Sequence, residues 1–233
     1  MKAMVLAAGR GRRMGALTLR CPKPLLSVGG EPMIVRHLRR LADSGIREVV
    51  INLSWQGARL RRALGDGAAW GVRLRYSDEG EPPLETAGGI IAALPLLGPE
   101  PFLVVNGDIV TDHPLRLAPL ADDRLGHLVL VDNPRHHPQG DFGLRGDRVQ
   151  RSGPTLTFAG VSLLHPALFA GLAPGARALA SVLLPAIAAG RISGEHYRGE
   201  WSDVGTPARL AAASRRLGAG AASSPSRRSR AAR

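Results

Sequence analysis

Residues 1–14 read MKAMVLAAGRGRRM, and residues 22–26 read PKPLL. The first seven residues are mostly apolar and predict a short buried strand, and the next seven form a loop rich in glycine and arginine. Glycine has no Cβ, so its backbone can approach a ligand closely, and arginine can grip phosphate oxygens with two parallel hydrogen bonds. Lys23 stands between two prolines that restrain its backbone. We therefore expect an anion site after the first strand, with a nucleoside triphosphate as the anion.

Two common phosphate-binding loops do not fit this stretch. No Gly-Lys-Ser/Thr follows at the spacing of a Walker A loop, and Met14 stands where a dinucleotide-binding loop has its third glycine. A Gly-x-Gly after a strand is by itself often only a turn. The longer string AAGRGRRM, with PKPLL behind it, is more specific and resembles the signature of the sugar-1-phosphate nucleotidyltransferases. That family usually has a small polar residue at the position of Arg12. The resemblance extends from residue 1 to about residue 217.

The composition is that of a globular protein. Hydrophobic residues make up 44% of the 233-residue chain, which suits one α/β domain with a sizeable core. Cys21 is the one cysteine, so no internal disulfide can form, and a reducing compartment is expected. The N-terminal apolar run is too short for a signal peptide, and no stretch approaches the ~20 apolar residues that span a bilayer. We expect a cytoplasmic protein with no membrane partner.

The formal net charge of +12 raises the alternative of a basic nucleic-acid-binding protein. Against it, aromatic residues make up only 4% of the chain, and no nucleic-acid-binding motif is present. From Gly218 onward the chain consists only of Gly, Ala, Ser, Pro and Arg. Such a segment cannot bury a core, so residues 218–233 are expected to form a disordered basic tail. Part of the charge lies in this tail, at Arg227, Arg228, Arg230 and Arg233.

The apolar periodicity predicts alternating strands and helices. Strands are expected at residues 2–7, 47–53, 72–76, 102–105, 128–131, 155–164 and 191–197, with two short hairpin strands at 142–144 and 148–150. Helices are expected at residues 32–44, 56–64, 86–94, 179–189 and 207–217. This order predicts a Rossmann-like three-layer αβα sandwich with a mostly parallel mixed sheet. We expect a single domain over residues 1–217, with a nucleotide-binding part (1–132) and a sugar-binding part (133–217).

A candidate metal site begins with Asn106-Gly107-Asp108, directly after an apolar strand. The carboxyl end of a parallel strand faces the ligand crevice of an open α/β sheet. Mg²⁺ typically takes one or two protein carboxylates and completes its shell with phosphate oxygens and water. Asp108 suits that role, although the same three residues could form a simple turn. The family carries a segment similar to residues 203–206, and the resemblance implies that Asp203 completes the metal site with Asp108. Otherwise Asp203 could be a charge at a helix N-terminus.

The resemblance also implies which residues bind the nucleotide. Arg13 would hold the triphosphate, and Lys23 would stabilise the α-phosphate in the transition state, so these two are the candidate catalytic residues. Residues 81–89, EPPLETAGG, resemble a family segment that lies against the nucleobase, with Glu85 in place of a glycine. The candidate nucleotide-binding residues are Ala8, Gly9, Gly11, Arg12, Arg13, Lys23, Glu79, Glu81 and Gly88.

The sugar-binding half departs from the family pattern in one respect. A Glu-Lys-Pro segment that often grips the sugar phosphate is missing, and residues 151–154 read RSGP instead. Residues 131–137, 140–142 and 193–199 resemble the branch of N-acetylmuramate-1-phosphate uridylyltransferases, which act in peptidoglycan recycling. His136 and His137 have no partners at the spacing of a zinc site. The candidate sugar-binding residues are Asn106, Asp141, Gly143, Arg135 and His196.

The implied reaction is the transfer of a nucleotidyl group to a sugar 1-phosphate, with release of pyrophosphate. Mg²⁺ is the expected cofactor. Small-molecule substrates are the expected partners, UTP and N-acetylmuramic acid α-1-phosphate in the first place, and no nucleic acid. A hexose-1-phosphate guanylyl-, thymidylyl- or cytidylyltransferase is the alternative within the class, because a few pocket contacts determine which base is bound.

Overall fold

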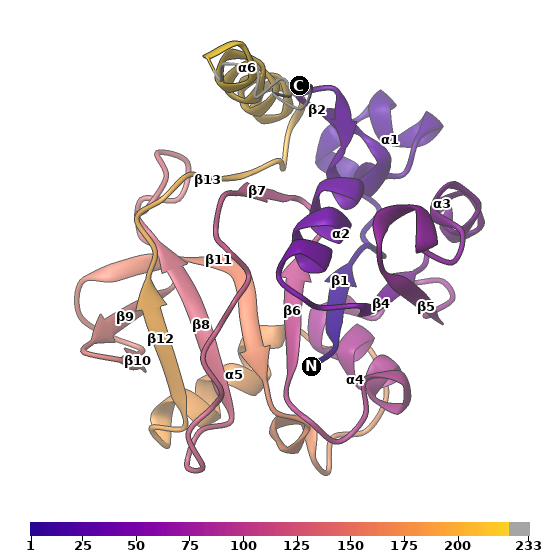
Figure 1. The fold of residues 1–233 in the computed structure, drawn as a ribbon. Helices are drawn as coiled ribbons and strands as arrows, with labels where there is room; N and C mark the ends of the chain where they lie inside the picture. The colour runs from indigo at the N-terminus through magenta and orange to yellow at the C-terminus, as the bar shows by residue number, and fades with distance from the viewer. Residues whose placement is uncertain (224–233) are drawn as a thin grey trace, which may run out of the picture.

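The computed structural model describes residues 1–223, and a nine-stranded sheet runs through its middle (Figure 1). The strand order is β5-β4-β1-β6-β11-β8-β12-β10-β9. The bounds in that order are Arg73–Asp78, Glu48–Leu53, Ala3–Leu6, Phe102–Asn106, Thr155–Leu164, Gly126–Val131, Ile192–His196, Arg148–Gln150 and Phe142–Arg145. The two short hairpin strands expected after residue 140 are therefore present as β9 and β10.

The sheet contains both parallel and antiparallel strand pairs. Strands β5, β4, β1 and β6 are all parallel, as expected for strands joined through helices. Strand β11 then runs antiparallel to both β6 and β8, while β12 lies parallel to β8. This confirms the mostly parallel mixed sheet predicted from the sequence. The antiparallel insertion of β11 joins the first and second halves of the chain in one sheet.

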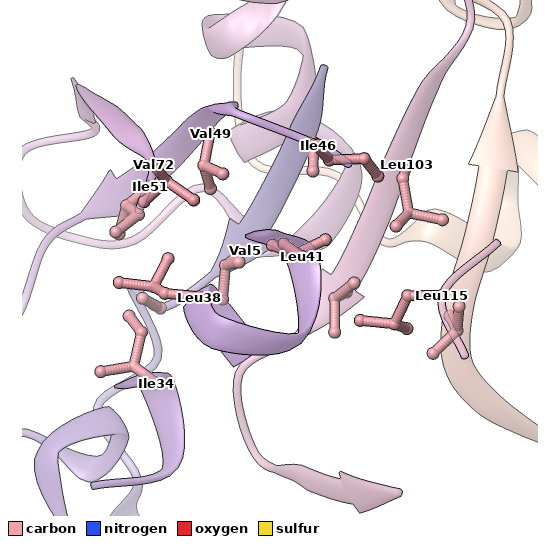
Figure 2. Packing of buried hydrophobic residues seen from close by; sticks show 14 of the residues in the cluster. Val5, Ile34, Leu38, Leu41, Ile46, Val49, Ile51, Val72, Leu103 and Leu115 are labelled. Carbon is pink, nitrogen blue, oxygen red and sulfur yellow. The ribbon is translucent and has the colours of Figure 1, made fainter. Parts of the chain in front are cut away.

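Helices cover both faces, and side chains alternate between them along each strand. On one face, α2 (Met33–Asp43) and α3 (Gly57–Leu64) pack against the sheet. Figure 2 shows Leu38 and Leu41 of α2 directed at Val5 and its neighbours. Both leucines are fully buried, which is worth ~1.5–3 kcal/mol each. On the other face lie α4 (Glu85–Leu97) and α5 (Leu179–Ala188), packed around Met4. The result is the predicted three-layer sandwich.

Short elements connect the larger helices and strands. They are the helical turns η1 (Arg12–Met14), η2 (Lys23–Leu25), η3 (Ala68–Trp70) and η4 (Pro166–Phe169), helix α1 (Ala16–Arg20), and strands β2 (Ser27–Val28), β3 (Glu31–Pro32), β7 (Ile109–Thr111) and β13 (Trp201–Asp203). The closing helix α6 (Pro207–Ser223) packs beside β2, as Figure 1 shows. A small third core, which includes Met14, Val204 and Ala213, ties this helix to the glycine loop.

Some helix boundaries differ from the prediction. Helix α4 continues past Pro95 to Leu97, and α6 runs to Ser223 instead of ending at Leu217. The expected tail is thus helical in its first part, and residues 224–233 lie outside the described residues. No helix within residues 1–223 is both long enough and apolar enough to cross a bilayer.

His37 of α2 makes the stability of this fold dependent on pH. The side chain is buried, and this burial, above all other causes, lowers its pKa from 6.5 to about 4; the nearby Arg40 and Arg36 also lower it, whereas Asp108 opposes the shift. His37 is therefore neutral in the folded protein. The unfolded chain takes up a proton as the pH falls below the ordinary histidine pKa, so folding stability is lost as the pH falls from about 6.5 towards about 4.

We therefore expect His37→Leu to remove this part of the pH dependence. Between about pH 7 and about pH 5, the wild type should lose about 2 kcal/mol more unfolding free energy than the variant. Urea unfolding of both proteins at the two pH values measures the difference. Equal losses in the two proteins would show that His37 does not remain neutral in the fold.

Candidate active site

The glycine loop and the Asn-Gly-Asp turn start side by side. Strands β1 and β6 are parallel neighbours with Leu6 opposite Asn106, so their carboxyl ends meet at one edge of the sheet. The Gly107 N–H donates to the Leu6 carbonyl at 3.0 Å. A Cβ at Gly107 would lie 2.4 Å from that same oxygen, so only glycine allows the strand ends to come this close. This contact sets Asp108 next to the loop.

Lys23 connects the loop to the turn. Its Nζ lies 2.5 Å from Asp108 Oδ2, and the lysine is 9% exposed. The lysine stem crosses the loop at Gly11, where a Cβ would lie 3.2 Å from the Lys23 Cβ. Gly11 also has a positive φ of 62°, which a residue with a side chain rarely adopts. The sequence motifs that predicted the site are thus joined by one ion pair.

A cavity of about 440 Å³ opens beside this ion pair, a size typical of small-molecule sites. Of the residues predicted to bind the nucleotide, it is lined by Ala8, Gly9, Gly11, Arg12, Arg13, Lys23 and Glu79. We call it the nucleotide-side cavity. Glu81 lies in an adjoining depression with Arg10 and Ser54.

Gly88 does not line either of these spaces. Its N–H donates to the Arg177 carbonyl at 3.2 Å, and a Cβ there would lie 2.3 Å from the Gly175 carbonyl oxygen. The absence of a side chain at Gly88 therefore lets α4 pack against the loop at residues 175–177. This corrects the expectation that Gly88 forms part of the wall of the nucleotide site.

Asn52 and Glu79 line the nucleotide-side cavity and are held in place by hydrogen bonds. Asn52 Oδ1 accepts a hydrogen bond from the Ala7 N–H at 2.7 Å, and its Nδ2 donates to Glu79 Oε1 at 2.6 Å. Glu79 Oε2 accepts from the Leu84 N–H at 2.8 Å. Both carboxylate oxygens of Glu79 are therefore engaged by the protein. The sequence analysis missed Asn52, although a buried amide in an otherwise apolar strand is a usable signal.

Asp203 joins the site from the far end of the chain. Strand β13 pairs with β7, with Asp203 opposite Ile109, and the Val204 N–H donates to the Asp108 carbonyl at 2.7 Å. Asp203 Oδ2 accepts from Arg209 Nη1 at 2.6 Å. Its other oxygen, Oδ1, is buried and accepts no hydrogen bond from the described residues, although His136 Nε2 lies 3.0 Å away.

These two carboxylates fit a magnesium ion. Asp108 and Asp203 line one common cavity, and the buried Oδ1 of Asp203 lacks a hydrogen-bond donor. Within residues 1–223 no group of three or more His, Cys, Asp and Glu side chains is positioned to hold a metal. A site with two carboxylates leaves the remaining positions of Mg²⁺ to phosphate oxygens and water, which is its usual coordination in nucleotide enzymes.

The cavity shared by these carboxylates has a volume of about 370 Å³ and lies on the side of β11 and the loop at residues 133–141. We call it the sugar-side cavity. Two of the candidate sugar-binding residues, Asn106 and Asp141, line it, and His136, His137, Phe158 and Trp201 lie there as well. Asp141 is held in place, because its Oδ2 accepts from the Phe158 N–H at 2.8 Å.

Three predicted sugar-binding residues do not line this cavity. A Cβ at Gly143 would lie 2.3 Å from the Ser152 carbonyl oxygen, so this glycine serves the close approach of the chain there. His196 Nε2 lies 2.9 Å from Asp132 Oδ1, and Arg135 is exposed outside the cavity. Gly143 and His196 lie outside the cavity because their segments pair in the sheet, and His196 also contacts the loop after β8 through Asp132.

Other polar residues of the segment at 193–199 also stabilise the fold. Glu195 Oε1 lies 2.8 Å from His113 Nε2, and the Tyr197 hydroxyl donates to Asp112 Oδ1 at 2.6 Å. These contacts tie β12 to the chain after β7. Arg209 also lines the sugar-side cavity, and the sequence analysis missed it. An arginine on a helix usually belongs to a solvated face.

The fold and the site are those of a nucleotidyltransferase, and comparison with known proteins agrees. The model of the nucleotidyl transferase family matches residues 2–145, and the chain belongs to this family. As the motifs predicted, it is a sugar-1-phosphate nucleotidyltransferase.

Two relatives indicate its place in the family, and one solved structure shares its fold. The chain is 49% identical over 229 residues to the N-acetylmuramate alpha-1-phosphate uridylyltransferase of Neisseria meningitidis serogroup B, covering 94% of this chain and 99% of that relative. It is 30% identical to a mannose-1-phosphate guanyltransferase of Aspergillus fumigatus over 89% of this chain, which spans 61% of that longer relative. The solved structure of the inositol-1-phosphate CTP transferase from T. maritima superposes with a TM-score of 0.78 over 97% of both chains at 20% identity, a likeness of fold.

The Asp108 carboxylate provides a direct test of the site. Asp108→Asn keeps the shape of the side chain and an acceptor oxygen but removes the charge that suits a metal ion. Loss of a metal-ligand charge removes several kcal/mol of transition-state stabilisation, so turnover should fall by more than about a hundredfold. Pyrophosphate release measures the turnover.

The matched control is Asp147→Asn, the same change at an exposed carboxylate outside both cavities. It should behave as the wild type, and both variants should unfold at the wild-type temperature to within a few degrees. Normal turnover and normal magnesium dependence in Asp108→Asn would contradict the role given to Asp108.

Proposed function

We propose that the protein transfers the uridylyl group of UTP to N-acetylmuramic acid α-1-phosphate and releases pyrophosphate. The observation that carries this proposal is the 49% identity, over nearly the whole of both chains, to a relative named for that activity. The two adjoining cavities support it, because one suits a nucleotide and the other a phosphorylated sugar. The product is an activated sugar, and peptidoglycan recycling is the process in which we place it.

The chemistry is an in-line displacement at phosphorus. A phosphate oxygen of the sugar 1-phosphate forms a bond to the α-phosphorus of UTP, the bond from that phosphorus to the β-phosphate oxygen breaks, and pyrophosphate leaves. No covalent enzyme intermediate is needed. The protein contributes positioning and charge neutralisation, which account for most of the catalysis of phosphoryl and nucleotidyl transfer.

We assign the cations of the site to separate phosphates. The N–H groups of Gly9 and Gly11, with the Arg12 and Arg13 guanidiniums, would hold the β- and γ-phosphates. Lys23 would turn from Asp108 to the α-phosphate and stabilise the charge that develops there. Its contact with Asp108, which lines both cavities, supports this assignment, since the α-phosphate must meet the incoming sugar phosphate.

Asp108 and Asp203 are the residues that would hold Mg²⁺. When bound, the ion neutralises phosphate charge and orients the reacting groups. In the structure, each of these carboxylates is paired with a cationic side chain, at 2.5 Å from Lys23 and 2.6 Å from Arg209. Both cations are therefore positioned to be released towards phosphates when the carboxylates take up the metal.

The division of labour follows the two halves of the sheet. We assign nucleotide binding to residues 1–132 and sugar binding to residues 133–217 within one domain. The alternative of a hexose-1-phosphate guanylyltransferase has weaker support, because the guanyltransferase relative is 30% identical. A basic nucleic-acid-binding protein lacks support from either cavity.

The sugar preference provides the test. N-acetylmuramate differs from N-acetylglucosamine by a lactyl ether that carries a carboxylate, and His136 and His137 line the cavity where this group would lie. A charge-assisted contact is worth roughly 1.5–3 kcal/mol, so kcat/KM should favour the muramate substrate by about tenfold to a hundredfold.

Pyrophosphate release with the four nucleoside triphosphates, each against a panel of sugar 1-phosphates, measures this preference. The highest kcat/KM should belong to UTP with N-acetylmuramate 1-phosphate. A ratio near one for the muramate and glucosamine substrates, or a preference for GTP with mannose 1-phosphate, would overturn the substrate assignment.

A further inference from the structure

The sugar-side cavity contains a cation that the nucleotide-side cavity does not share. Arg13 lines both cavities, whereas Arg209 of α6 lines only the sugar-side one. The side chain of Arg209 is 21% exposed. Its backbone N–H donates a hydrogen bond to the Thr206 hydroxyl at 3.3 Å. The residue therefore lies in the first turn of the helix, and its backbone is held in place.

Arg13 and Arg209 converge on one point beside Gly205. A Cβ at Gly205 would lie 2.3 Å from Arg209 Nη2 and 3.2 Å from Arg13 Nη2. The glycine thus leaves room for two guanidiniums from opposite ends of the chain. Gly205 lines the nucleotide-side cavity, so the point of convergence lies where the two cavities meet.

The local charge balance leaves this convergence positive. Asp203 is the carboxylate bonded to Arg209, at 2.6 Å from Nη1, and the same Nη1 lies 2.5 Å from His136 Nε2. Asp108 is already paired with Lys23. For the Arg13 guanidinium no ion pair is found among residues 1–223. Two neighbouring guanidiniums, of which only Arg209 is paired with a carboxylate among the described residues, repel each other, and a bound anion relieves that repulsion.

The geometry points to a role for Arg209 that goes beyond the proposed function while resting on it: Arg209 binds the phosphate of the sugar 1-phosphate, next to the triphosphate that Arg13 holds. The planar fork of arginine matches phosphate oxygens bidentately. Arg209 Nη1 is engaged by Asp203 and His136, whereas Nη2 makes no hydrogen bond to the described residues and faces the point shared with Arg13.

The position distinguishes this phosphate from the other anions of the reaction. The β- and γ-phosphates belong to the glycine loop, in a cavity that Arg209 does not line. The lactyl carboxylate is attached to a ring carbon other than the one that carries the phosphate. The reacting phosphate must lie beside Asp108 and Asp203, where Arg209 is. Arg209 is therefore the sugar-phosphate-binding cation of this site.

Arg209→Gln tests the assignment. The amide has no charge and no fork, and it ends near the position of the arginine Nε. The KM for the sugar 1-phosphate should rise roughly tenfold to a hundredfold, the range expected for a lost charge-assisted hydrogen bond. The factor should be the same for N-acetylmuramate and N-acetylglucosamine 1-phosphates, and the KM for UTP should not change. Arg209→Lys should restore part of the loss, since it returns the charge without the fork.

The matched control is Arg215→Gln, the same change at an exposed arginine of the same helix. It should leave all three Michaelis constants at wild-type values. Calorimetric titration of each variant with the sugar 1-phosphate, without nucleotide, measures the binding separately from turnover and should show the same loss in Arg209→Gln alone.

Three results would overturn the assignment. A loss confined to the muramate substrate would give Arg209 to the lactyl carboxylate. A matching rise in the KM for UTP would give it to the triphosphate. Unchanged sugar binding with an altered magnesium requirement would leave it only a support of Asp203. If the wild type turns over a different nucleotide or sugar, the proposed function fails, and the same comparison with that sugar 1-phosphate still tests Arg209.

Discussion

The rest of the site depends on the ion pair between Lys23 and Asp108. It can form because β1 and β6 are parallel neighbours and because Gly107 lets the Leu6 carbonyl approach its Cα. The pair joins a loop built for phosphates to a carboxylate suited to a metal, at 2.5 Å, with the lysine side chain 11% and the aspartate side chain 36% exposed. The buried lysine is the costly partner to leave without a counter-charge. The ion pair therefore holds the two halves of the reaction centre together until the charges of the substrates take its place.

Both carboxylates of this centre are paired with cations before any substrate arrives. Asp108 is paired with Lys23 and Asp203 with Arg209. Substrate binding becomes an exchange of partners, in which phosphates take the cations and the carboxylates become available to a metal ion. Such preorganised charges require little rearrangement during the reaction itself.

Local signals in the sequence were sufficient for the loop after β1 and for the amphipathic helix α2, because these depend on residues close together in the chain. The antiparallel insertion of β11 could not be predicted, since strand order is decided by long-range pairing. Glycines were the least reliable guide: Gly88 was expected to face the nucleotide but allows helix packing instead. Arg209 resembled any arginine on a solvated helix face, and only the fold brings it to the sugar-side cavity.

The central claim is that Lys23 exchanges Asp108 for the α-phosphate. A crystal structure of the protein with magnesium and a non-reactive UTP analogue tests it most directly. The account predicts that Lys23 Nζ moves away from Asp108 Oδ2 and lies within hydrogen-bonding distance of an α-phosphate oxygen. A structure in which the nucleotide fills its cavity while the 2.5 Å contact between Lys23 and Asp108 persists would contradict the account.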